Sequence, residues 1–270
     1  MSVVYVKGEY VAAENARISI DERGFRFGDG VFETMRIANG TTKHLARHLT
    51  RLELGLSALH IPSPSESLHD IAQQLIDKNA TADGVLRISV SRGIGSRGYM
   101  PSLPDAPPTL VAEILPMPAL TDEPLTLWLS QWQKPSSNAL PIEAKLMQGV
   151  NSTLARLEAQ RNDCDESLML NDKGAICEAS SANIFWRSGG LIYTPDSACG
   201  LVKGIAREIL LERWQVQSAA FDVENLKHAN SVMLCNSIRG AMAVFSLHPV
   251  GWQWMDGSLA NEANEILNAA

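Results

Sequence analysis

Apolar residues along the chain recur with two periods, and each period predicts a different secondary structure. Steps of four, three, four and three residues, the period of an amphipathic helix, separate Leu45, Leu49, Leu52, Leu56 and Leu59. The same period predicts helices over residues 66–78, from Asn151 onward, over 204–214 and over 261–267. In the helix that starts near Asn151, we expect Leu154 and Leu157 to face a core.

Short runs of alternating apolar and polar residues predict β-strands joined by tight turns. Residues 3–11 alternate around Lys7-Gly8, and an extended run that residues 18–27 lead into ends at Asn39-Gly40. Asn-Gly favours a hairpin because both residues accept positive φ. Strands are also predicted over residues 86–91, 109–115, 125–129, 167–170, 175–178, 183–186, 191–194, 231–235 and 241–245. These elements indicate an α+β fold with largely antiparallel sheets.

A proline-rich stretch over residues 115–124 is the best candidate for an interdomain linker. It divides the 270 residues into a small N-terminal α+β domain over 1–118 and a larger C-terminal α+β domain over 119–270, which carries Lys145. Two domains of this size can each bury a core of their own.

Charge and cysteine usage narrow the function classes. The net charge is −7 and the pI is about 5.4, so the chain shows no electrostatic footprint for nucleic acid or an anionic membrane. The four cysteines lack metal-ligand spacing and are interpreted as reduced thiols. No signal peptide and no membrane-spanning segment is apparent, so we expect a cytoplasmic protein.

Four separated segments carry candidate chemistry. Lys145 lies just before a predicted helix, and Glu178 lies in the run Cys-Glu-Ala-Ser-Ser-Ala-Asn-Ile-Phe. Gly204-Ile205 opens a helix and Ser237 follows a strand, so both are candidate phosphate-binding turns. A single lysine at such a position is usually a solvated surface residue. Together, however, an amine nucleophile, a carboxylate for a pyridinium nitrogen and two phosphate-binding turns are the parts that a pyridoxal phosphate site needs.

The segment between the strands at 86–91 and 109–115 is a further candidate for function. It is too long and too rich in glycine and proline for a simple hairpin turn, and long loops in compact domains are often functional. A mobile connector is the alternative. Arg92, Arg97 and Tyr99 give this loop the chemistry to bind a carboxylate, because a guanidinium can engage one with two hydrogen bonds.

In these segments the chain resembles the class IV (fold type IV) pyridoxal-phosphate enzymes, which include branched-chain and D-amino acid aminotransferases and 4-amino-4-deoxychorismate lyases. The resemblance is carried, in the family's order, by residues 27–34, 48–52, Lys145, 178–185, 204–207 and 235–238. It implies a two-domain α+β fold with the cofactor between the domains. It also implies a homodimer in which the active site lies at the subunit interface and borrows a loop from the partner.

The resemblance also implies a role for each of these residues. Lys145 would bind pyridoxal 5′-phosphate covalently and then act as a base. Glu178 would keep the pyridinium nitrogen protonated, and Arg51 would hold the phosphate. The phosphate site would be completed by Gly204, Ile205, Ala206, Ser237 and Ile238.

The substrate loop favours a lyase. Residues 91–99, Ser-Arg-Gly-Ile-Gly-Ser-Arg-Gly-Tyr, are similar to the loop of aminodeoxychorismate lyases, with Ser96 in place of a glycine. Phe32 stands where D-amino acid aminotransferases have a tyrosine. The resemblance therefore implies formation of 4-aminobenzoate and pyruvate, a step in folate biosynthesis, with an aminotransferase for D-amino acids or branched-chain amino acids as the alternative and a non-catalytic binding module as a third. The candidate substrate contacts are Phe32, Thr34, Arg92, Arg97, Tyr99 and Arg239.

Overall fold

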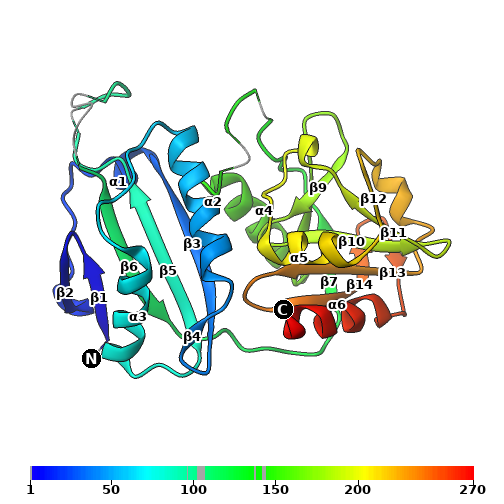
Figure 1. Cartoon of the computed structure of the whole chain (residues 1–270). Helices are drawn as coiled ribbons and strands as arrows, with labels where there is room; N and C mark the ends of the chain where they lie inside the picture. Colours follow the sequence, from blue (N-terminus) through cyan, green and yellow to red (C-terminus); the bar gives the residue numbers. More distant parts are fainter. Residues whose placement is uncertain (1, 96, 102–106, 137, 142–143) are drawn as a thin grey trace. The chain divides into compact units, whose positions relative to one another are not determined.

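A computed structural model describes the whole chain except residues 1, 96, 102–106, 137 and 142–143 (Figure 1). The chain divides into two compact units. The first comprises Met1–Ala119 and Ala144–Gln148, and the second comprises Leu120–Glu143 and Gly149–Ala270. Each unit has helices packed on its own sheet, so the predicted α+β class is confirmed. No helix among the described residues is long and apolar enough to cross a membrane.

The first unit is a six-stranded antiparallel sheet covered on one face by two helices. Its strand order is β2-β1-β6-β5-β3-β4. The elements are β1 (Val3–Val6), β2 (Glu9–Ala12), α1 (Arg23–Phe27), β3 (Gly30–Ala38), β4 (Thr41–Thr42), α2 (Leu45–Ala58), α3 (Leu68–Asn79), β5 (Gly84–Ser91) and β6 (Thr109–Leu115). Helices α2 and α3 place apolar residues such as Leu52, Leu56 and Leu75 in one core with the inward face of the sheet.

The tight turns of this unit form where the sequence predicts them. Lys7 and Gly8 have φ values of 50° and 91°, and Asn39 and Gly40 have 51° and 71°. Positive φ at both central residues is the geometry of a type I′ turn, whose twist matches that of paired strands. Both hairpins are therefore confirmed.

The residues that lead into β3 differ from the prediction of an extended run, because Arg23–Phe27 forms the short helix α1. Its first turn is capped by the Glu22 side chain, which accepts a hydrogen bond from the Gly24 amide. Its end is set by Gly28, whose φ of 65° is left-handed. A helix of one turn leaves no periodic pattern for a sequence to show.

The second unit is built on a nine-stranded mixed sheet. Its main path is β12-β11-β10-β13-β14-β7-β8-β9, and β15 pairs with β14. The elements are β7 (Leu125–Leu129), α4 (Val150–Arg161), β8 (Glu166–Leu170), β9 (Ile176–Ala179), β10 (Asn183–Ser188), β11 (Leu191–Pro195), α5 (Ile205–Arg213), β12 (Val216–Ala219), β13 (Ser231–Asn236), β14 (Gly240–His248), β15 (Trp252–Gln253) and α6 (Ser258–Ala269). Helices α5 and α6 bury Phe185, Met233 and Cys235 against one face of the sheet.

The inward face of α4 is not the one that the sequence predicts. Leu157 is 40% exposed, and Leu154 is only half-buried. The fully buried residues are Ala155 and Ala159, on the helix that contacts β7 and β8. Small side chains allow the helix to approach the strands closely, so alanines rather than leucines form this contact.

The segment that carries Lys145 is grouped with the first unit, whereas the sequence-based division assigns it to the second domain. The Phe32 amide donates to the Lys145 carbonyl (3.0 Å), and the Met147 amide donates to the Gly30 carbonyl (2.9 Å). These bonds attach residues 144–148 to β3. The remaining boundary, at residue 119, lies in the predicted linker.

Candidate active site

The side chain of Lys145 lies on an aromatic residue of the first unit. Its Nζ is 4.3 Å from the centroid of the Phe32 ring, and the Arg87 guanidinium carbon is 4.1 Å from the same centroid. Phe32 is on β3 and Arg87 is on the neighbouring strand β5, opposite Thr34. Two predicted site residues, Lys145 and Phe32, are thus brought together beside a cation that the sequence analysis did not single out.

Period-2 geometry places Thr34 and Arg36 on the same face of β3 as Phe32. Arg36 is half-buried, and among the described residues its buried Nε has no hydrogen-bond partner. Burial lowers the pKa of Arg87, which Glu113 partly offsets. This face is therefore rich in incompletely solvated positive charge, a property suited to an anionic ligand. The sequence contains a signal for this face, because Arg36 and Arg87 each stand at an outward position of a strand whose other face is buried.

Arg51 forms an ion pair with Glu33, which belongs to the same unit. Its Nε and Nη2 donate to the two oxygens of Glu33 at 2.7 and 2.6 Å, and His48 Nδ1 lies 2.7 Å from Glu33 Oε2. Burial alone would raise the pKa of Glu33, but hydrogen bonds and charge from His48 and Arg51 outweigh it and hold the pKa below its usual value. Glu33 thus fixes the Arg51 guanidinium in one orientation. The contact between Arg51 and a cofactor phosphate stays a prediction.

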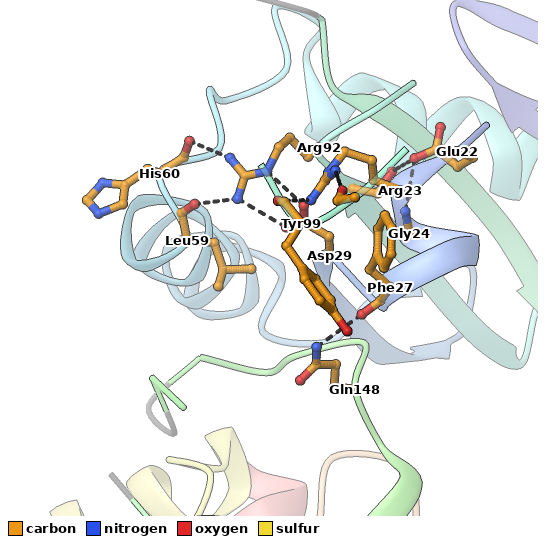
Figure 2. Close-up of polar contacts among 12 residues, drawn as sticks. Glu22, Arg23, Gly24, Phe27, Asp29, Leu59, His60, Arg92, Tyr99 and Gln148 are labelled. Carbon is orange, nitrogen blue, oxygen red and sulfur yellow. Dashed lines mark hydrogen bonds and ion pairs between the residues drawn. The ribbon is translucent and has the colours of Figure 1, made fainter. Parts of the chain in front are cut away.

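Arg92 is engaged in holding the fold. Its guanidinium donates to both oxygens of Asp29 (2.8 and 3.0 Å) and to the carbonyls of Leu59 and His60 after α2 (2.7 and 3.0 Å), as Figure 2 shows. These contacts occupy most of its donors, so we do not retain Arg92 among the proposed substrate contacts. The side chains of Arg97 and Tyr99, in contrast, are exposed.

In the second unit, Glu178 is buried and surrounded by donors. Its carboxylate accepts hydrogen bonds from the Asn183 side chain (3.0 Å) and the Val202 amide (3.1 Å). It also forms an ion pair with Lys134 at 2.7 Å. The charge of Glu178 raises the pKa of Lys134 despite the opposing effect of burial. Lys134 was not singled out from the sequence, because a lysine in an irregular segment carries no signal of a distant partner.

The same edge of this unit carries the N-terminus of α5. Asn183, which starts β10, pairs with Cys235 at the end of β13, and Ala206 packs in one cluster with Cys235. No side chain caps the helix, and a Cβ at Gly204 would lie 2.1 Å from Asn183 Oδ1. The N-terminal amides of α5, which include those of Ile205 and Ala206, are therefore not covered by a capping side chain.

The turn after β13 is organised by Asn236. Its Oδ1 accepts hydrogen bonds from the Ile238 amide (3.0 Å) and the Arg239 amide (2.8 Å). The Ile238 amide is thus already used within the turn, whereas Ser237 and Arg239 have half-buried side chains. Asn236 is a residue that the sequence analysis missed, although an asparagine that starts a turn is a common signal.

These groups fit a phosphorylated pyridine. A buried carboxylate suits a protonated ring nitrogen, and an uncapped helix N-terminus beside a glycine suits a phosphate. In the first unit, the Lys145 side chain carries the amine that such a cofactor needs for a covalent bond. The described residues include no group of three or more His, Cys, Asp or Glu side chains that could hold a metal ion.

Comparisons with known proteins all point to one enzyme family. Residues 30–247 match the family model for amino-transferase class IV. The chain is 29% identical over 291 residues to the aminodeoxychorismate lyase of Bacillus subtilis (98% of this chain, 92% of the relative). It is 28% identical over 256 residues to a putative branched-chain-amino-acid aminotransferase of Methanocaldococcus jannaschii (90% and 87%). It is 25% identical over 257 residues to a D-alanine aminotransferase of Staphylococcus aureus (92% and 89%).

The fold also matches that of a solved enzyme. A T.th. branched-chain amino acid aminotransferase complexed with N-(5'-phosphopyridoxyl)-L-glutamate superposes with a TM-score of 0.90 at 23% identity, covering 99% of this chain and 93% of the other. At this identity the match establishes the fold.

Proposed function

The chain belongs to the amino-transferase class IV family, whose enzymes use pyridoxal 5′-phosphate, and from that premise we propose that it is a pyridoxal-phosphate-dependent 4-amino-4-deoxychorismate lyase. The substrate loop carries this choice. Residues 91–99 are similar to the loop of such lyases, and the loop presents the exposed side chains of Arg97 and Tyr99. The aminodeoxychorismate lyase relative, which matches 98% of this chain, supports the same choice.

Lys145 and Glu178 are the proposed catalytic residues. When bound, the cofactor supplies a ring that stabilises negative charge on the carbon that bears the substrate's amino group. Lys145 Nζ would hold the cofactor covalently, and the same amine would be the base that takes the proton from C4 of the substrate. Glu178 holds a proton on the ring nitrogen, and its bonds to Asn183 and Val202 fix its orientation. The proposed phosphate contacts are Arg51, Gly204, Ile205, Ala206, Ser237 and Ile238.

The reaction balances without an oxidant or an acceptor. As the C4 proton leaves, the electron pair of its bond forms a double bond to the neighbouring carbon of the substrate ring, and the bond from that carbon to the enolpyruvyl oxygen breaks, with the electron pair leaving on the oxygen. The products are aromatic 4-aminobenzoate and the enolate of pyruvate, which takes up a proton on its methylene carbon to become pyruvate. We assign the removal of the C4 proton to Lys145, whose Nζ lies on the Phe32 ring.

The substrate carries two carboxylates, so the site must supply cations. Arg97 remains the leading candidate, and Arg239 is a second. The structure adds Arg36 and Arg87, which share the face of the first unit's sheet with Phe32 and Thr34. Because burial disfavours the charged form of Arg87, an anion on this face would regain the electrostatic energy that burial removes.

We also propose a homodimer. Two parts of the first unit, residues 18–25 and the described residues 94–95 and 97–100, lie near each other, since the Gly95 amide donates to the Asp21 carbonyl (3.1 Å). Their exposed apolar side chains are Ile18, Ile20, Phe25, Ile94, Tyr99 and Met100. A monomer rarely exposes such a concentration of apolar surface, so a second copy is the proposed occupant.

Subunit complementation tests the shared site. Inactive Arg97→Ala subunits mixed with inactive Lys145→Ala subunits are expected to recover part of the activity, because a heterodimer then owns one intact site. Arg26→Ala mixed with Lys145→Ala serves as the control for an exposed arginine near the same surface. No recovery after verified subunit exchange would show that Arg97 serves its own subunit.

The second candidate function is that of an aminotransferase, which the similarity to branched-chain and D-alanine aminotransferases supports. Analysis of the reaction products distinguishes it from the lyase. With 4-amino-4-deoxychorismate and no keto acid, the lyase releases 4-aminobenzoate and pyruvate in equal amounts. An aminotransferase turns over D-alanine or branched-chain amino acids only with an acceptor such as 2-oxoglutarate, by ping-pong kinetics. Activity that requires the acceptor would overturn the lyase proposal.

A further inference from the structure

Arg23, in α1, lies buried beneath the substrate loop with only 4% of its surface exposed. Its Nη1 donates to the Gly98 carbonyl (3.0 Å) and its Nη2 donates to the Tyr99 carbonyl (2.8 Å). Figure 2 shows this guanidinium beside Asp29, with Tyr99 across from it. One side chain thus holds two consecutive carbonyls of the loop, directly after Arg97.

The packing around Arg23 reinforces these hydrogen bonds. Its guanidinium carbon lies 4.9 Å from the centroid of the Phe27 ring, and the Phe27 and Tyr99 rings are 5.5 Å apart. A Cβ added at Gly95 would lie 2.6 Å from Arg23 Cδ, so the loop main chain rests on the stem of the arginine. Arg23 therefore contacts the loop on both sides of Arg97.

The Asp29 carboxylate holds the Arg23 guanidinium in place. Arg23 Nε donates to Asp29 Oδ2 at 2.7 Å, and Arg92 shares the same carboxylate. Burial would raise the pKa of Asp29, but hydrogen bonds and charge from Arg92 and Arg23 hold it below its usual value. One carboxylate does not neutralise two guanidinium groups, so the carbonyl dipoles of the loop and of the α2 end supply the remaining negative partners.

We propose that Arg23 is a positioning residue for the substrate: by holding the carbonyls of Gly98 and Tyr99, it fixes the direction in which Arg97 and Tyr99 present their side chains. This inference rests on the proposed function, because it takes the loop to be the substrate's binding element. The division of labour between the two arginines on Asp29 follows from their contacts. Arg23 anchors the loop, whereas Arg92 anchors the end of α2.

The test is Arg23→Lys in the full-length holoenzyme. A lysine keeps the charge beside Asp29 but is a point donor, so it cannot bond Asp29 and two carbonyls in the planar geometry of the guanidinium. Arg26→Lys is the matched control, because Arg26 lies on the same helix and forms an ion pair with the half-exposed side chain of Asp21. Arg23→Gln, which also removes the charge, is measured in parallel.

Two readouts are taken. Hydrogen exchange followed by mass spectrometry reports on the peptide that covers residues 97–101, and steady-state kinetics with 4-amino-4-deoxychorismate reports KM and kcat. In Arg23→Lys we expect faster amide exchange in this peptide and a KM raised about ten- to a hundredfold, because loss of precise placement has effects of this size. The kcat and the absorption spectrum of the cofactor stay at the wild-type values.

Three results would overturn the inference. They are unchanged exchange in the loop, a faster-exchanging loop with an unchanged KM, and equal effects in Arg26→Lys. Global unfolding is recognised by faster exchange in β5 and β6, and in that event Arg23→Gln and Arg23→Lys are compared at a lower temperature where both are folded. Failure of the proposed function is distinguishable, because wild-type enzyme would then form no 4-aminobenzoate; KM is in that case measured with the amino acid that it does turn over.

Discussion

Replacing Gly204 with alanine tests whether the α5 N-terminus and Glu178 form one structural unit. Gly204 has ordinary backbone angles (φ −68°, ψ 138°), so alanine introduces no backbone strain. The new Cβ would instead lie 2.1 Å from Asn183 Oδ1. Asn183 is 4% exposed and cannot move into solvent without breaking its contacts.

The size of the effect follows from what Asn183 loses. Its Nδ2 donates to Glu178 Oε2 (3.0 Å) and to the Val202 carbonyl (2.9 Å). Each buried group that is left without a partner costs roughly 1–3 kcal/mol, so the loss of these two hydrogen bonds in Gly204→Ala should lower the free energy of unfolding by about 2–6 kcal/mol. Gly257→Ala is the matched control, since Gly257 also precedes a helix and its Cβ would meet Ala243 at 3.6 Å. We expect the control to cost less than about 1 kcal/mol.

Urea unfolding in a double-mutant cycle provides the assay. Asn183→Ala removes the obstructing oxygen, so adding Gly204→Ala to that background should cost less than about 1 kcal/mol. The coupling free energy between the two positions is then at least about 1 kcal/mol. Equal costs of Gly204→Ala in the wild-type and Asn183→Ala backgrounds would refute the steric argument.

Three further predictions concern the charged groups. After borohydride reduction, peptide mapping should find the pyridoxyl group on Lys145, and finding it on Lys134 or Lys203 would contradict the proposed role. Lys134→Met should lower the free energy of unfolding by about 3 kcal/mol because it leaves the Glu178 carboxylate buried without its cation, whereas Lys134→Arg should cost less in the same urea titration. Because the pKa of Glu33 is lowered in the folded state, its ionised form stabilises the fold above the unfolded-state pKa, and this contribution is lost as pH falls from about 5 towards the lower folded-state pKa. Unfolding measured between those pH values should therefore be less pH-dependent in Glu33→Gln, and an identical pH dependence would count against the coupling.

Much of the fold is readable from the sequence because its signals are local. Strands β6 and β7 have the predicted bounds, and the hairpins at Lys7-Gly8 and Asn39-Gly40 depend only on residues that accept positive φ. Helix α1 was missed because a single turn has no period. The prediction that Leu157 faces the core was wrong, because an apolar residue does not reveal how closely a helix approaches its sheet. In α4 the buried residues Ala155 and Ala159 set that distance.

The candidate site was readable in part. The order of the motifs indicates Lys145, Glu178 and the α5 N-terminus, because each motif is a short run of residues. Their partners are far apart in sequence: Arg23 contacts the loop carbonyls 75 and 76 positions later, and Lys134 reaches Glu178 across α4 and β8. No local pattern records such a pair, since only the tertiary fold brings the two groups together.

The arginines show why residue type alone is a weak guide to an anion site. Arg51, Arg92 and Arg23 each satisfy much of their guanidinium with a buried carboxylate or with main-chain carbonyls, and such contacts are what a buried arginine needs to avoid the cost of desolvation. Arg87 is different, because its guanidinium lies on the Phe32 ring and the charge of Glu113, on the paired strand β6, only partly offsets the effect of burial on its pKa. An arginine whose charge is only partly compensated retains more electrostatic free energy to give to a ligand. The sheet face of Phe32, Arg36 and Arg87 is for that reason a better substrate-binding candidate than Arg92, although Arg92 lies in the loop that the sequence points to and these three residues do not.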